Sequence, residues 1–184
     1  MLSMLIALSL LQAAASGPPP AQAETIQGWN LASSAQGCLV HTTQRAGTVL
    51  SVFALPEQDG IGFLLQNRKW TGLRDGAVYP LSIRFDDGSE WPVPAIARIE
   101  IDEDGPGLFF AIRPGSESGG QDFMSEFASA RAMRIDTDSG PVDRLRLTNS
   151  RGATVALAQC LSRLWGGEAN PFGDSEGART ATRI

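Results

Sequence analysis

The chain has 184 residues, with 15 Lys or Arg against 20 Asp or Glu and a formal net charge of −5. Its length fits one domain, and 42 % hydrophobic with 19 % charged residues is typical of a globular protein that can bury a core. The acidic balance argues against non-specific binding to nucleic acid, which needs a basic surface to displace counterions from phosphates.

The N-terminal segment predicts export. An apolar run of about ten residues, Leu2–Leu11, leads through small residues to Ala21-Gln22-Ala23, although nothing basic precedes it. The run suits the hydrophobic region of a signal peptide and is shorter than the roughly 20 residues of a membrane-spanning helix. We expect residues 1–23 to be a signal peptide and the mature protein to be periplasmic or secreted. Retention of the segment as an anchor is the alternative.

The next part of the sequence has the pattern of short strands joined by tight turns. Apolar and polar residues alternate, and Asp-Gly pairs stand between such runs, as is typical of hairpins. Pro92 and Pro94 cannot donate ladder hydrogen bonds, so they should mark a strand edge or a strand entry. The expected strands cover residues 28–33, 38–44, 48–55, 61–67, 77–86, 93–101 and 107–112.

Two helices are expected in the second half of the chain. Over 121–133, Phe123, Phe127 and Ala130 share one helical face, and Asp122 suits the N-cap. Strand patterns follow at 133–138 and 142–149, with Leu145 and Leu147 on one side. A second helix over 151–165, capped by Asn149 or Ser150, should carry one apolar stripe made of Ala153, Leu157, Cys160, Leu161 and Leu164.

The sum of these elements is a mainly β (α+β) fold. We expect an antiparallel β-sandwich or partly open barrel with two short helices that cover an opening or an edge. It should form one domain over residues 24–165. Residues 166–184 have little to bury and are expected to be a disordered tail.

The two cysteines, Cys38 and Cys160, are expected to form a disulfide. Both fall in ordered elements of an exported chain, and the bond would join an early strand to the last helix. The Cys-x-x-His spacing of Cys38 and His41 also allows a zinc site with Cys160, or a Cys–His nucleophilic pair. Residues three apart on a strand point to opposite faces, which argues against both.

No nucleophile–base motif or complete metal-binding loop is present, and His41 is the only histidine. Acidic residues cluster around two hairpins, and a pair of them could perform glycosidase chemistry, although solvated acidic turns are the simpler interpretation. Trp70 stands among cations in a polar connection, so Trp70, Arg68 and Arg74 form a candidate recognition patch. The acidic clusters are Glu100, Asp102, Glu103 and Asp104, and Asp86, Asp87 and Glu90.

Several stretches carry a family resemblance. They are the early Gly-Trp pair, a cysteine about nine residues on, LLQNRKWTGLRDGAVYPLSIRFD, the segment around SEFASARAMRI, and VDRLRLTNSRGATVALAQC. Over residues 28–163 the chain resembles uncharacterised small exported proteins of alpha-proteobacteria, and it is distantly similar to the invasion-associated locus B family, which usually carries more cysteines. The resemblance implies an exported domain with paired terminal cysteines and supplies no catalytic residues.

These observations favour a non-enzymatic periplasmic binding or interaction domain without cofactor or metal. Its partner would be an envelope protein or a small ligand, with no nucleic acid and no membrane span after signal cleavage. Two alternatives remain open: a carboxylate-dependent hydrolase of cell-envelope glycans, and an inhibitor or chaperone-like partner of an envelope protein.

Overall fold

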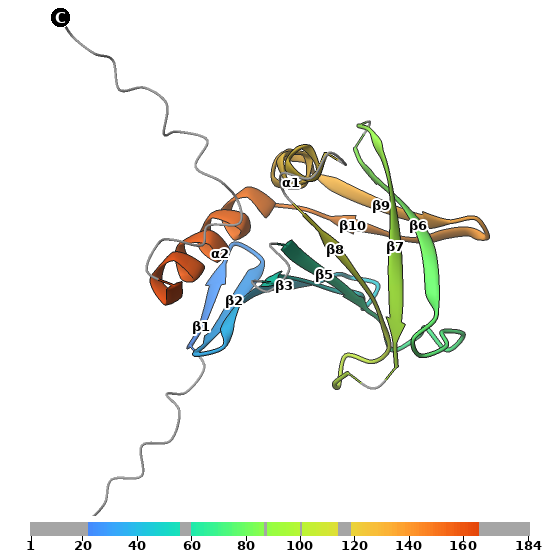
Figure 1. Ribbon diagram of the computed structural model, residues 1–184, viewed down its shortest axis with the longest axis horizontal. Helices are drawn as coiled ribbons and strands as arrows, with labels where there is room; N and C mark the ends of the chain where they lie inside the picture. The colour runs from blue at the N-terminus through green and yellow to red at the C-terminus, as the bar shows by residue number, and fades with distance from the viewer. Residues whose placement is uncertain (1–21, 56–59, 87, 100, 114–118, 166–184) are drawn as a thin grey trace, which may run out of the picture.

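Ten strands form one antiparallel sheet that is not closed. The computed structural model describes residues 22–55, 60–86, 88–99, 101–113 and 119–165, so most of the expected signal peptide, the expected tail, Asp87 and Glu100 lie outside the described residues. The strand order is β1-β2-β3-β4-β5-β8-β7-β6-β9-β10, and Figure 1 shows the sheet curling round. The strands are β1 Gln22–Ile26, β2 Trp29–Ser34, β3 Gly37–Thr43, β4 Val49–Leu55, β5 Gly60–Gln66, β6 Val78–Phe85, β7 Glu90–Arg98, β8 Gly107–Ile112, β9 Ala132–Thr137 and β10 Gly140–Arg146.

The prediction of a mainly β, antiparallel fold with two helices is confirmed. The first strand, β1, is an addition that the sequence pattern did not indicate. It pairs with β2 through a two-residue turn whose members, Gln27 and Gly28, both have positive φ (44° and 92°), as this tight hairpin turn requires. The expected cleavage point after Ala23 therefore lies inside a strand.

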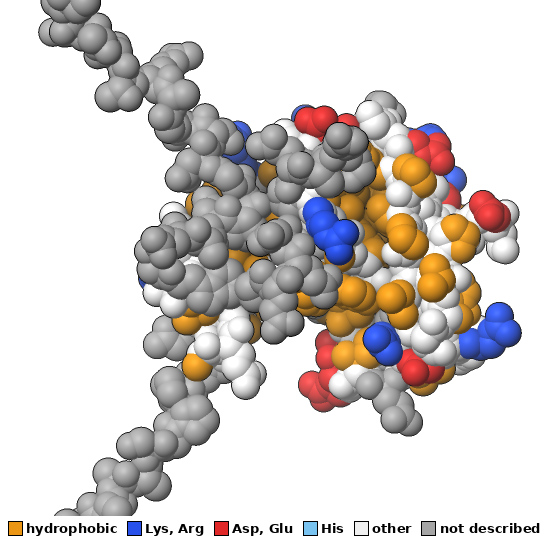
Figure 2. Space-filling view, in the orientation of Figure 1, with side chains coloured by type: hydrophobic (Ala, Val, Ile, Leu, Met, Phe, Trp, Pro, Cys, Tyr) orange, Lys and Arg blue, Asp and Glu red, His pale blue; other side chains and the backbone are white. Residues whose placement is uncertain are grey.

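The two prolines of β7 interrupt its pairing with β8. Pairing covers only Ile96–Arg98 against Gly107–Phe109, and β7 ends at Arg98, earlier than the expected residue 101. The Ala97 N–H donates to the Ala77 carbonyl on the β6 side, so by alternation Pro92 and Pro94 direct their backbone nitrogens towards β8. They offer no donor there, and the two strands separate. Residues of both strands line a cleft of about 450 Å³ at this point, on a face where Figure 2 shows hydrophobic side chains gathered over β7 and β8.

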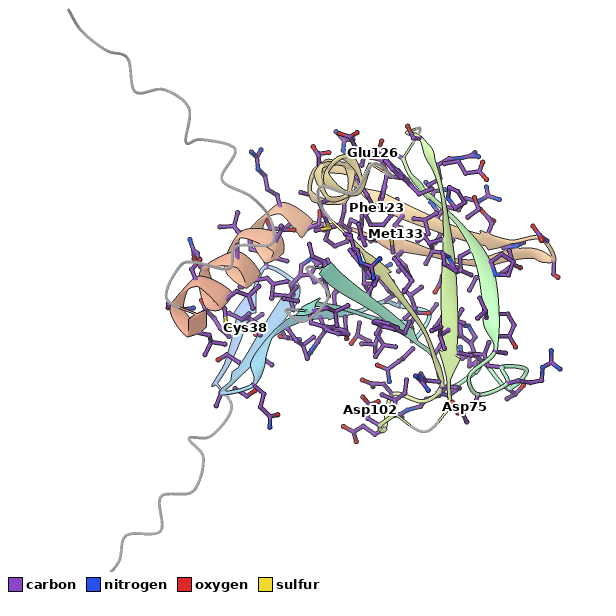
Figure 3. All side chains as sticks on the ribbon, viewed as in Figure 1. Cys38, Asp75, Asp102, Phe123, Glu126 and Met133 are labelled. Atoms are coloured by element: carbon purple, nitrogen blue, oxygen red, sulfur yellow. A yellow bond between two sulfur atoms is a disulfide. The ribbon has the colours of Figure 1, made fainter. Side chains whose placement is uncertain are left out.

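Helix α1 (Gly120–Ser129) inserts two phenylalanines into the core. Phe123 and Phe127 are fully buried and meet Phe63 edge-on, with ring centroids 5.4 Å apart in both pairs. In Figure 3, Phe123 points from α1 towards the sheet. The expected N-cap was wrong: Gly119 caps the helix with φ 75° and no side-chain bond, and Asp122 lies in the first turn. The helix also ends before Ala130, because residues 132–137 are paired in β9.

Helix α2 (Ser150–Trp165) packs against β2, β3 and α1. Four members of the predicted stripe are buried, whereas Leu164 is 38 % exposed near the end of the helix. Cys160 is bonded to Cys38 on β3, so the disulfide connects residues 122 positions apart. The bond joins the last helix to an early strand, the arrangement that the two cysteines predict.

Side chains hold the last strand against the turn between β3 and β4. The Gln44 amide pairs with the backbone of Arg146 in both directions: it donates to the carbonyl (3.2 Å) and accepts from the N–H (2.9 Å). The Thr48 hydroxyl, fully buried, donates to the Asp143 carboxylate of β10. These side-chain contacts join the β3–β4 turn to β10. The open sheet therefore approaches the shape of a barrel, although no backbone hydrogen-bond ladder connects the two parts.

Candidate functional site

The candidate site begins with the turn that follows β5. Asn67 is buried; its side-chain oxygen accepts the Lys69 N–H (2.9 Å), and its carbonyl accepts the Trp70 N–H (3.0 Å). The Asn67 amide donates to Thr48 (2.8 Å), which is itself bonded to Asp143. An asparagine that bonds the backbone two residues on is a local turn former. Here the same side chain also ties the turn to Thr48 in the β3–β4 turn and, through Thr48, to β10, so the backbone at Trp70 has a defined position.

Trp70 lines an open groove of about 670 Å³ at one end of the curled sheet. It is half-buried and packs on the edge of the core together with Leu73 and Tyr79. Helix α1 covers the opposite end, because its Phe123 contacts Phe85 at the far end of the strand that carries Tyr79. The groove is lined by Lys69, Trp70, Thr71, Gly72, Leu73, Tyr79, Pro80, Leu108, Thr137, Asp138, Ser139, Pro141 and Val142.

The walls of this groove, hereafter the Trp70 groove, are mainly apolar, and its polar groups lie at the rim. The Tyr79 hydroxyl accepts the Arg74 N–H (3.2 Å), which leaves its own proton available to donate to a ligand. Lys69 and Asp138 are exposed and carry opposite charges. An apolar body with a few polar groups near its edge is the usual composition of a ligand pocket, and the mouth of a barrel is a frequent place for one.

The predicted recognition patch is only partly gathered at this groove. Trp70 lines it, but Arg68 and Arg74 are not among its lining residues. The Arg68 guanidinium donates to the Glu103 carbonyl (2.5 Å) and so joins the β5–β6 connection to the β7–β8 connection. Sequence reasoning missed Tyr79, Leu73 and the β9–β10 turn, because no local pattern indicates that they meet Trp70.

The acidic residues proposed for glycosidase chemistry lie elsewhere. Asp102 accepts from the Gln66 amide (2.7 Å) and the Asp104 N–H, and Figure 3 shows it at the end of the molecule away from α1. Asp86 accepts the N–H groups of Arg131 and Ala132, both at 3.0 Å. These carboxylates bond within the fold, and none of the described members of the two acidic clusters lines the Trp70 groove.

Glu90, in the second acidic cluster, has a pKa below its ordinary value, because it accepts hydrogen bonds from Ser82 (2.6 Å) and Arg84 (2.7 Å). A glycosidase acid needs the opposite shift, since it must hold a proton near neutral pH.

The cysteines and the histidine do not come together as a site. Cys38 is buried on the core side of β3, whereas His41 lies on the opposite face, where its Nε2 is 3.3 Å from the Asn30 amide. Both sulfurs are taken up in the disulfide. Within the described ranges, no group of three or more His, Cys, Asp or Glu residues could hold a metal ion. No described helix has the length and apolar character needed to cross a membrane.

No family model matches the chain, and no curated protein or solved structure matches it.

Proposed function

We propose that this chain is an exported, non-enzymatic binding domain that takes its ligand in the Trp70 groove. The observation that carries the proposal is convergence: three segments far apart in sequence supply the walls of one apolar groove. They are the β5–β6 connection together with the start of β6, Leu108 of β8, and the end of β9 with the β9–β10 turn and the start of β10. A groove of this kind leaves apolar surface exposed to water, which is unfavourable, and a bound ligand would cover that surface.

The position of the aromatic side chain supports the same proposal. The Trp70 turn rests on the buried Asn67 amide and the Thr48 hydroxyl, so the indole is presented by an ordered backbone. Rigid aromatic side chains lose little conformational entropy on binding, which is why tryptophan is enriched where binding energy is concentrated. The ligand is therefore a molecule or peptide segment with an apolar body that lies against the Trp70 ring.

Export is the second half of the proposal. It rests on the apolar N-terminal run, on the small residues before Glu24, and on a disulfide that suits an oxidising compartment. The intact mass of the protein from the periplasmic fraction tests it. We expect a chain that begins at Glu24, with two alkylated thiols only after reduction. A full-length chain with two freely alkylated thiols would contradict export.

The groove can be tested with the apolar aromatic dye 8-anilinonaphthalene-1-sulfonate, titrated into the oxidised, folded protein. The NMR resonances of the indole N–H groups report where the dye binds. The indoles of Trp29 and Trp91 donate hydrogen bonds to Thr148 and Glu126 inside the fold, so the Trp70 resonance should shift selectively. We expect saturable binding that Trp70→Ala weakens by about tenfold or more, as for an aromatic hot spot.

The matched control is Val78→Ala. Val78 is 61 % exposed, lies beside Tyr79 on β6, and is not among the residues that line the groove. This variant should bind the dye as the unmodified protein does. Absence of saturable binding, or equal binding by the Trp70→Ala variant with an unchanged melting temperature, would refute the proposed site.

A further inference from the structure

Three arginines lie side by side on adjacent strands of the sheet. The register pairs Arg84 of β6 with Arg134 of β9, and Arg134 with Arg144 of β10. All three side chains are exposed on the outer face of the sheet. Neighbouring strands are about 5 Å apart, so the flexible side chains can reach a common point. We call Arg84, Arg134 and Arg144 the arginine row.

Like charges directly opposite one another destabilise a sheet unless they are compensated. Two members of the row have carboxylate partners: Arg84 pairs with Glu90 at 2.7 Å, and Arg134 pairs with Asp136 through two hydrogen bonds of 2.7 and 3.0 Å. Arg144 forms no ion pair with any described carboxylate. Arg144, at the end of the row, is therefore the one member without an ion-pair partner among the described carboxylates.

A polar groove of about 430 Å³ runs along the row, lined by Arg84, Asp86, Gly88, Glu90, Ala132, Arg134 and Arg144. Its two carboxylates are already engaged, since Asp86 accepts two backbone N–H groups and Glu90 accepts from Ser82 and Arg84. The guanidinium groups keep free donors, because each has five N–H bonds, and Arg84 uses one of them for Glu90 while Arg134 uses two for Asp136. The groove thus offers hydrogen-bond donors that an anion can accept.

We propose that the arginine row binds a phosphate group. A tetrahedral phosphate has three or more oxygens directed to different sides, which matches donors arriving from three strands, whereas a planar carboxylate is satisfied by one guanidinium. Glu90 and Asp136 hold two of the guanidinium groups in place, and Arg144 supplies the unpaired charge. This site shares no lining residue with the Trp70 groove, and the inference does not depend on the function proposed there.

Two probes, inorganic phosphate and phosphatidic acid vesicles, distinguish a site for a soluble phosphate compound from a site for a lipid headgroup. Inorganic phosphate is titrated into the folded protein while the arginine Nε–H resonances are followed by NMR. In parallel, the protein is sedimented with vesicles of phosphatidylcholine alone and with vesicles that also contain phosphatidic acid. A response to inorganic phosphate only assigns the site to a soluble phosphate compound, and co-sedimentation with the phosphatidic acid vesicles alone assigns it to a lipid headgroup.

Arg144→Gln and Arg146→Gln form a matched pair of variants. Both residues are exposed on β10, both changes remove one charge, and only Arg144 lines the groove. We expect Arg144→Gln to weaken phosphate binding by about tenfold, as for loss of a charge-assisted hydrogen bond, with little change for Arg146→Gln. Equal weakening by both variants would show diffuse attraction to positive charge and overturn the proposal, as would no response to either phosphate source.

Discussion

Breaking the disulfide between Cys38 and Cys160 should cost this protein a large part of its stability. The bond closes a loop of 122 positions, and the chain-entropy model gives about 5 kcal/mol at 25 °C for a loop of that size. Total stabilities of domains are about 5–15 kcal/mol, so the reduced protein should be marginal. The physical reason lies in the unfolded state, which the bond prevents from expanding.

Urea unfolding of three samples separates the contributions. The oxidised protein serves as the reference, the reduced protein has the same side chains without the bond, and a Cys38→Ala/Cys160→Ala variant also loses the sulfur volume from two buried positions. With a slope of roughly 2 kcal/mol per molar urea, a loss of about 5 kcal/mol on reduction should lower the midpoint by about 2.5 M. The slope itself should rise, because the open chain exposes more surface on unfolding.

Reductant should have no effect on the double alanine variant, which is the control for side reactions. Because both sulfurs are buried, the native bond should react with reductant only after local or global opening. Equal midpoints for the oxidised and reduced proteins would refute the reasoning, and so would a stability loss found only in the double alanine variant.

Three smaller perturbations test other parts of the fold. Gly62→Ala should destabilise the protein by about 1–3 kcal/mol in chemical denaturation, because the new Cβ would lie 2.7 Å from the Phe53 ring on the outer face. Gly37→Ala is the control: its new Cβ would meet nothing within 4 Å, so this change should be neutral or slightly stabilising. Thr48→Val removes the acceptor of the buried Asn67 amide and should cost about 1–3 kcal/mol in the same assay; an unchanged midpoint would contradict the role of this contact. The pKa of Glu90 is lowered in the folded protein, so its ion pair contributes above the unfolded pKa and is lost on acidification. The melting temperatures of the unmodified protein and Glu90→Gln should therefore differ at about pH 7 and converge at about pH 3, and a constant difference would contradict this assignment.

Much of the local structure could be predicted from periodicity and turn chemistry. Alternation along β10 and into the residue after it places Leu145 and Leu147 in the core and Arg144 and Arg146 outside, as observed. The apolar stripe of α2 predicts its buried face apart from the exposed Leu164. These features depend on residues close in sequence, so a local pattern is enough to indicate them. Pro92 and Pro94 were expected to mark a strand edge or a strand entry; they lie instead inside β7, an inner strand, on the side where its pairing with β8 is interrupted.

The candidate sites could not be predicted in the same way. Trp70 is conspicuous in the sequence because it stands among cations, yet the arginines beside it do not line its groove. The residues that line the groove, such as Tyr79 and Val142, belong to no sequence pattern that indicates a function. The arginine row has no sequence pattern at all, because its members are 50 and 10 positions apart along the chain and become neighbours only through the β6–β9 and β9–β10 registers.

Apart from the β1–β2 hairpin, the sequence alone determined the hairpins, the two amphipathic helices, the buried faces and a cysteine pair suited to a disulfide. Each follows from local spacing or from there being only two cysteines. Tertiary structure decided the strand order, with β5 beside β8 and β6 between β7 and β9, and thereby which surfaces meet. That order depends on how the curled sheet buries Phe63, Phe123 and Phe127 together, a cooperative packing problem spread over the whole chain. Both proposed sites are consequences of that packing.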